Sequence, residues 1–116
     1  MAGGFGPDAR LRARREFLAV EDGGRRVPGR FVILVGKPND RAADRLGIIA
    51  SRRVGNAVAR NRAKRRLRDM FRRREPLAGP RALDVVAIAR PDLVRAPFAD
   101  VQSDFLAALK KLRGAR

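Results

Sequence analysis

Residues 51–74 read SRRVGNAVARNRAKRRLRDMFRRR, and this stretch decides much of what the chain can be. Eleven of its residues are Lys or Arg, and Asp69 is its only acidic residue. Gly55 and Asn56 interrupt the chain ahead of a long run of good helix formers, and Asn is a residue type that caps helix N-termini. The sequence therefore predicts a basic helix from about Ala57 to Arg73.

The basic residues of this predicted helix are arranged by face. At 100° per residue, one side gathers the apolar residues Ala59, Ala63, Leu67, Met70 and Phe71. The opposite side carries Asn61, Arg65, Arg68 and Arg72, with Arg60 and Lys64 on one edge and Arg62 and Arg66 on the other. We expect the apolar side to dock on a core, which leaves a long guanidinium surface suited to an array of phosphates.

A solvated helix surface is the ordinary alternative for a run of charge. Such surfaces normally mix the two signs, and this one does not. Like charges four residues apart, as in Arg60, Lys64 and Arg68, cost a few tenths of a kcal/mol each. We therefore favour a functional surface, which Arg52 and Arg53 extend; the alternative for these two residues is an exposed turn.

The composition of the chain points to a polyanionic partner. With 116 residues it is expected to form one domain, and its formal charge of +16 comes from 28 basic and 12 acidic residues. The absence of Cys and His excludes thiol redox chemistry, the usual zinc sites and every nucleophile–His arrangement. The acids are dispersed, and Asp84 within an apolar run is the least ordinary of them. We expect no catalytic residue and no metal site in the chain.

The rest of the sequence predicts a small α+β sandwich, in which three helices pack on one mixed sheet of about four strands. Strands are expected at residues 31–35, 46–53 and 83–89, with a short extra strand near 25–28. Helices are expected from residue 9 or 14 to 22 and from 98 to 112, and Pro76 with Gly79-Pro80 should end the basic helix. The strand–helix–strand unit at 46–89 would by default cross over right-handed.

The chain carries no sign of a membrane span or an export signal. No apolar run approaches about 18 residues, and the N-terminus lacks the apolar core of a signal peptide. We therefore expect a cytoplasmic protein that does not bind membranes. Residues 1–8 are expected to be a flexible N-terminal segment, and residues 9–116 a single RNA-binding domain.

The stretch from Arg45 to Arg72, RLGIIASRRVGNAVARNRAKRRLRDMFR, resembles the signature of the protein subunit of bacterial ribonuclease P. The shared features are a strand ending in Ser and two basic residues, then Gly-Asn-Ala-Val, then a helix that starts with Arg-Asn-Arg. Residues 11–20, 31–34 and 83–90 resemble the flanking elements of the family. The resemblance spans roughly residues 10 to 112.

The resemblance implies a fold and a function. The family fold is an α–β sandwich with a left-handed crossover around the basic helix. The holoenzyme is an endonuclease that removes the 5′ leader of precursor tRNA; its catalytic groups and Mg²⁺ belong to the RNA subunit, and no protein partner is required. By matching position, the residues that face RNA would be Arg52, Arg53, Asn56, Arg60, Asn61, Arg62, Lys64, Arg65 and Arg68.

The resemblance also implies a cleft for the single-stranded leader, and the candidates for it are Arg12, Phe17 and Leu34. A lone Phe in an amphipathic helix is more often part of a core, so Phe17 is open to both interpretations. The family often carries further aromatic residues where this chain has Glu21 and Leu34, so a leader held by stacking would meet fewer rings here.

Two other classes share the high positive charge. A ribosomal or other structural RNA-binding protein would not need the Arg45–Arg72 signature. A DNA-binding module would place the basic helix in a major groove, but the chain shows neither a helix-turn-helix context nor dimerisation heptads.

Overall fold

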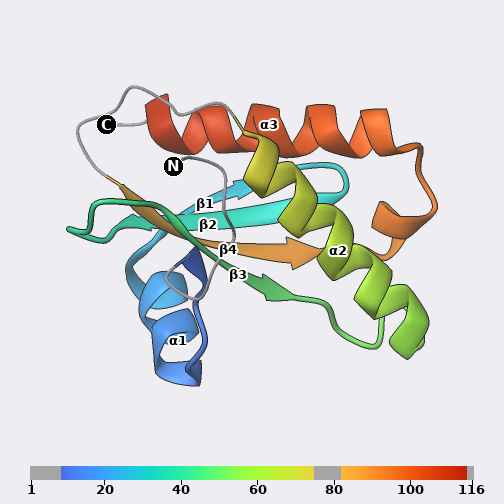
Figure 1. The fold of residues 1–116 in the computed structure, drawn as a ribbon, viewed down its shortest axis with the longest axis horizontal. Coiled ribbons are helices and arrows are strands. Elements are labelled where there is room, and N and C mark those ends of the chain that lie inside the picture. The colour runs from blue at the N-terminus through green and yellow to red at the C-terminus, as the bar shows by residue number, and fades with distance from the viewer. Residues whose placement is uncertain (1–8, 75–81, 115–116) are drawn as a thin grey trace.

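The computed structural model describes residues 9–74 and 82–114. Its elements, in chain order, are α1 (Arg14–Gly23), β1 (Arg25–Pro28), β2 (Val32–Pro38), β3 (Arg45–Ile49), α2 (Ala57–Arg73), β4 (Leu83–Ala89), the 3-10 helix η2 (Pro91–Val94) and α3 (Phe98–Gly114). The four strands form one sheet in the order β1-β2-β4-β3 (Figure 1). Strand β3 pairs with β4 in parallel, and the other pairs are antiparallel. The predicted α+β fold, with three helices on a mixed four-stranded sheet, is confirmed.

The helices cover the two faces of the sheet unequally, with α2 and α3 on one face and α1 on the other (Figure 1). Alternation along β4 places Val85 and Ala87 in the larger core, beneath α2 and α3, and Val86 in a smaller cluster beneath α1. The apolar side of α2 docks as predicted, because Ala63, Leu67, Met70 and Phe71 are all buried in the larger core. The polar side of α2 is thereby turned to solvent.

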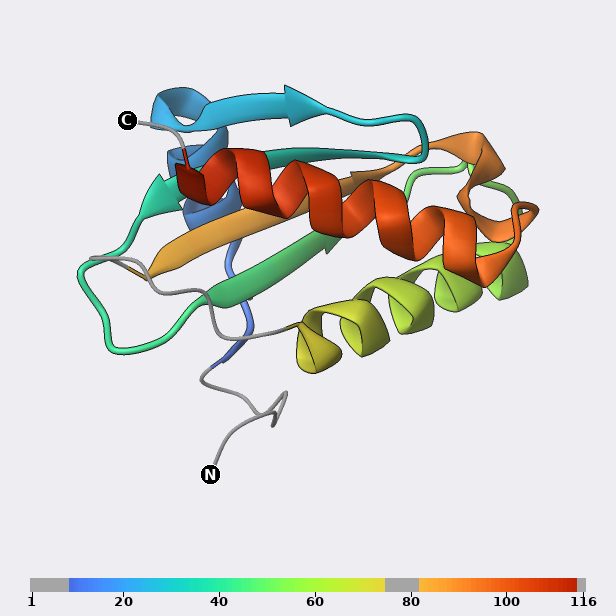
Figure 2. The same cartoon turned by 90° about the horizontal axis from the view of Figure 1, so that it is seen from above.

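The crossover from β3 through α2 to β4 is left-handed. In Figure 2 the sheet is seen from the α2 and α3 side, and the parallel arrows of β3 and β4 run to the right with β4 above β3. When the view is turned so that both arrows point up, β4 lies to the left of β3. The right-handed default is therefore wrong for this chain, and the family expectation holds. Helix α2 packs along the β3 edge of the sheet, against β3, η2 and α3, instead of lying across the β3–β4 pair.

Two of the predicted strands have different boundaries in the structure. The third strand ends at Ile49 instead of Arg53, because Ser51–Gly55 form a turn in which the N–H groups of Val54 and Gly55 donate to the carbonyls of Ser51 and Arg52, each at 3.0 Å. The strand predicted at 31–35 runs instead from Val32 to Pro38, where the antiparallel pairing with β4 ends at Leu83. The predicted helix stop at residues 76–80 lies outside the described residues.

Within the described ranges, no helix has the length and apolar character needed to cross a bilayer.

Candidate nucleic-acid interface

The entry to α2 is fixed by Gly55 and Asn56. Gly55 has a φ of +144°, a conformation that L side chains rarely adopt. The Asn56 side chain accepts a hydrogen bond from the Ala59 N–H at 2.9 Å, so Asn56 caps the helix as predicted. The first turn of α2 therefore has a defined direction relative to the Ser51–Gly55 turn, which carries Arg52 and Arg53.

We expect Asn56→Ala to destabilise the protein by about 1 kcal/mol, because the first turn loses its cap. Asn56→Ser keeps a hydroxyl that can cap and is the matched control. Urea unfolding followed by circular dichroism gives both free energies of unfolding. Equal losses for Ala and Ser would show that the cap contributes nothing.

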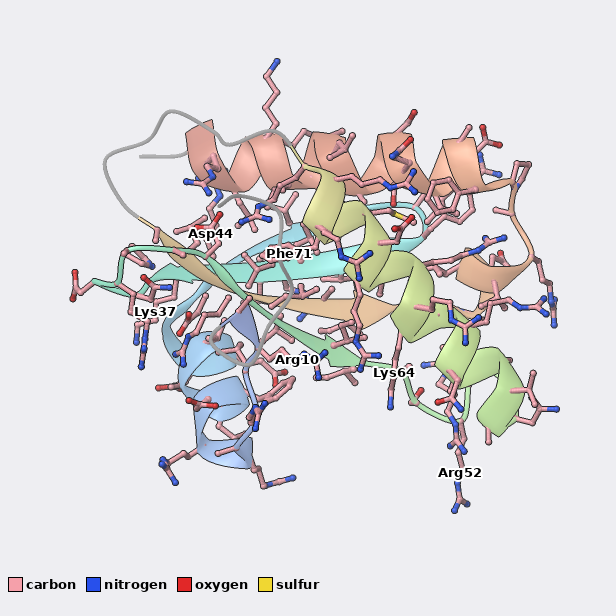
Figure 3. All side chains as sticks on the ribbon, in the orientation of Figure 1. Arg10, Lys37, Asp44, Arg52, Lys64 and Phe71 are labelled. Carbon is pink, nitrogen blue, oxygen red and sulfur yellow. The ribbon has the colours of Figure 1, made fainter. Side chains whose placement is uncertain are left out.

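The cations of α2 fall into two groups, according to whether the fold already uses them. Within the described part of the chain, one group makes no hydrogen bond or ion pair through its side chains; it consists of Arg52, Arg53, Arg60, Arg62, Lys64, Arg65 and Arg68. Arg62 and Arg65 are exposed, and Arg60, Lys64 and Arg68 are half-buried. Figure 3 shows Lys64 and Arg52 pointing to the same side of α2, away from α3. We name this group, with Asn56 and Asn61, the α2 surface.

The second group is engaged within the protein. Arg66 donates to the carbonyl oxygens of Leu93 and Ala96 at 3.0 and 2.9 Å, and its guanidinium lies 5.9 Å from the Phe98 ring centroid. Arg72 and Arg73 pair with Asp69 at 3.4 and 3.3 Å. The expectation that Arg66 belongs to the open guanidinium surface is therefore wrong, because Arg66 binds the segment around η2.

The leader-cleft candidates are divided between the two faces of the sheet. Phe17 lies on the α1 face, half-buried, and packs with Ile49 and Ile88 against the smaller cluster. Arg12 is exposed just before α1. Leu34 has no exposed surface and lies in the larger core beneath α3. The leader-cleft prediction for Leu34 is therefore wrong, because strand alternation points its side chain to the opposite face from Phe17.

An ion network that sequence reasoning missed joins α1 to the sheet. Arg45 binds Asp84 through Nε and Nη2, at 2.9 and 2.7 Å, and Glu16 through Nη1 at 3.2 Å. The parallel register places Arg45 directly beside Asp84, which explains an acid within an apolar strand. The hydrogen bond with Asp84 raises the pKa of Arg45. Burial alone would raise the pKa of Asp84, but the hydrogen bonds that Asp84 accepts from Arg45 and Asn39 outweigh this effect and lower it. The only signal in the sequence was the unusual position of Asp84.

Glu16 makes the free energy of unfolding depend on pH in the acidic range. Hydrogen bonds from the backbone N–H groups of Arg12 and Ala13, then the charge of Arg45, lower the pKa of Glu16 from 4.5 to about 2. A carboxyl whose folded pKa is depressed stabilises the fold above its unfolded pKa, and this stabilisation is lost as pH falls through the folded value. We expect Glu16→Gln to lower the urea midpoint at pH 6–7, with a difference from the parent that shrinks between pH 4.5 and 2. A difference independent of pH would contradict this assignment.

The acidic side chains that the structure describes do not fit a metal site. Among residues 9–74 and 82–114, no three His, Cys, Asp or Glu side chains are grouped so that they could hold a metal ion. Glu16 and Asp84 both bind the same guanidinium. Their charge is therefore directed at Arg45 and is not available as a cation cage.

The chain is similar to one family in sequence and in structure. The family model described as Ribonuclease P matches residues 5–113. The ribonuclease P protein component of Gluconacetobacter diazotrophicus is 41% identical over 113 residues, which cover 91% of this chain and 94% of that protein. The one from Syntrophomonas wolfei is 35% identical over 103 residues, covering 89% and 86%. The solved structure of the RNase P protein from Thermotoga maritima superposes with a TM-score of 0.80 at 34% identity, covering 90% of this chain and 98% of that one.

Proposed function

This chain belongs to the ribonuclease P protein family and is the protein component of that ribonucleoprotein endonuclease; from this premise we propose that its α2 surface binds the catalytic RNA and that the face around Phe17 receives the 5′ leader of precursor tRNA. The RNA subunit is its partner, and the chain acts as the accessory subunit. Family membership also decides against the ribosomal and DNA-binding alternatives.

The observation that carries the first part of the proposal is the set of cations on α2 without an intramolecular partner. An isolated protein gains nothing from keeping Arg60, Lys64 and Arg68 unpaired in one row, because like charges four residues apart on a helix repel. A folded RNA offers several successive phosphates over the length of such a helix, and guanidinium groups bind phosphates in a bidentate manner. The N-terminus of α2 adds exposed N–H groups and a positive dipole beside Arg52 and Arg53.

The second part of the proposal rests on the α1 face of the sheet. Phe17 is an aromatic ring with part of its surface exposed, and the partly exposed apolar side chains of Ile49 and Ile88 pack against the same small cluster. Exposed Arg12 lies at the start of the same helix and is available for a phosphate. Glu21 is exposed on α1 and would repel a phosphate. The leader would therefore be held by stacking and apolar contact at Phe17 more than by charge.

The remaining parts of the proposal follow from this division of labour. We assign the Mg²⁺ of the holoenzyme to the RNA subunit, because the described acids of this chain are not arranged to hold a cation. The assembly is proposed to work in the cytoplasm without a further protein subunit. The protein would lower the repulsion between two polyanions, which suits its charge of +16.

Reconstitution with a bacterial ribonuclease P RNA tests the proposal. At low Mg²⁺ and physiological salt, we expect 5′ trimming of precursor tRNA to depend on the protein. If six to ten phosphates are contacted, affinity for the RNA should fall about 10³–10⁵-fold between 50 and 200 mM salt. Trimming that is equally fast without the protein, or binding that prefers duplex DNA, would refute it.

A further inference from the structure

We infer that Arg45 is a positioning residue: it fixes helix α1 and the Phe17 ring on the sheet, and thereby sets the surface that receives the leader. This inference rests on the leader contact proposed above. It concerns the face of the sheet opposite to α2, so its consequences can be separated from binding of the catalytic RNA.

The guanidinium of Arg45 is fully used within the protein. Nε and Nη2 bind the two carboxylate oxygens of Asp84, and Nη1 binds Glu16 Oε2. Asn39 Nδ2 donates to Asp84 Oδ1 at 2.9 Å, the same oxygen that accepts from Arg45 Nε. Only 12% of the Arg45 side chain is exposed, so it offers little surface to a phosphate. Arg45 differs in this respect from the open cations of the α2 surface.

Glu16 carries the link from Arg45 to the start of α1. Its Oε1 accepts hydrogen bonds from the backbone N–H groups of Arg12 and Ala13, at 2.7 and 3.0 Å. The N–H of Leu11 also donates to the carbonyl oxygen of Leu46, the residue after Arg45, at 3.0 Å. The first turn of α1 is therefore attached to the β3–β4 pair through one carboxylate, and the next residue along the helix is Phe17.

Gly47 completes this arrangement beneath the Phe17 ring. A Cβ atom at Gly47 would lie 2.6 Å from both Cε2 and Cζ of Phe17, so the ring rests directly on the backbone of β3. Gly47 follows Arg45 by two residues and is on the same face of the sheet. The ring is thus positioned by its close approach to Gly47 and by the Arg45–Glu16 contact, which holds the residue that precedes Phe17 on α1.

Loss of Arg45 would act mainly on this face. The apolar cluster beneath α1 is small, with Leu11, Val20, Val35 and Val86 as its buried members, so the polar contacts form a large part of the attachment. Without the guanidinium, the carboxylates of Glu16 and Asp84 would face each other without a counter-charge. We expect α1 to shift and the Phe17 ring to move with it, while α2 keeps its place on the other face.

A double-mutant cycle tests the inference in the reconstituted holoenzyme. The variants compared are Arg45→Met, Phe17→Ala and the double variant. For each, we measure the affinity for precursor tRNA with a leader of several nucleotides and divide it by the affinity for the same RNA with a single-nucleotide leader. We expect each single change to reduce this ratio about tenfold, the scale of one stacked base, and the double change to reduce it no further. Affinity for the catalytic RNA and its salt dependence should not change.

Lys110→Met is the matched control, because it removes one exposed charge from α3, on the opposite face of the sheet from α1 and Glu16. All variants are compared at a temperature where circular dichroism shows them folded, and Arg45→Lys replaces Arg45→Met if the latter does not fold. A ratio unaffected by Phe17→Ala refutes the leader contact itself and this inference with it. A ratio that responds to Phe17→Ala but not to Arg45→Met, or additive effects of the two changes, overturns the inference alone.

Discussion

Replacing Arg62, Arg65 and Arg68 together by Gln is expected to weaken binding of the catalytic RNA roughly 100-fold at 150 mM salt. Each phosphate contact contributes about 0.9 to the slope of log affinity against log salt, so three lost contacts should flatten this slope by about 2.7. None of the three side chains has a partner within the described residues, so little of the loss should come from a weakened fold. Filter binding to the RNA subunit at several salt concentrations measures both quantities.

A second triple variant separates the location of the charge from its amount. Arg41, Lys110 and Lys111 are exposed and lie outside the α2 surface, and replacing them by Gln also lowers the net charge by three. We expect this control to retain most of the affinity and nearly the full salt slope. Equal losses in the two variants would show that net charge, and not the α2 surface, governs assembly.

The largest effect on stability is expected for Asp44→Ala. Asp44 is 6% exposed, and it accepts a hydrogen bond from the Leu83 N–H at 2.7 Å and pairs with Arg74 and Arg113. It thereby ties the ends of α2 and α3 to the start of β4. Its removal leaves partly buried guanidinium groups without their carboxylate, and we expect the free energy of unfolding to fall by about 3–5 kcal/mol.

Asp69→Ala is the matched control for this prediction. Asp69 also pairs with two Arg residues, but it lies on the outer side of α2 with 27% of its side chain exposed. Pairs of this kind contribute about 0–1 kcal/mol. Urea unfolding of both variants at neutral pH gives the comparison. A loss below about 1 kcal/mol for Asp44→Ala would mean that solvent replaces the carboxylate and that the three elements hold together without it.

The sequence alone predicted α2 well, and the reason is that the evidence for a helix is local. The cap at Asn56, the apolar residues at helical spacing and the limits of the helix all depend on residues a few positions apart. The same local pattern identified the side of α2 that turns to solvent. The family resemblance added the left-handed crossover, which the general preference for right-handed connections would have missed.

Local patterns could not show which face of a strand a residue occupies. The family resemblance suggested Leu34 for the leader cleft, and an uninterrupted apolar run such as residues 31–35 has no polar residues to show that Leu34 faces the larger core instead. Likewise, nothing near Arg66 in the sequence indicates that it binds carbonyl groups 27 and 30 residues away. Partners at such distances are brought together only by the packing of α2 against η2.

Charge and periodicity are properties of the chain, so they are enough to predict a basic, amphipathic helix on a small α+β domain and to suggest a polyanion as its partner. The packing of the folded protein sets which cations remain available to that partner. Arg45, Arg66 and Arg113 are chemically equivalent to Arg62 and Arg65. They differ because carboxylates and carbonyl groups of residues far away in the sequence lie beside the first three and not beside the last two.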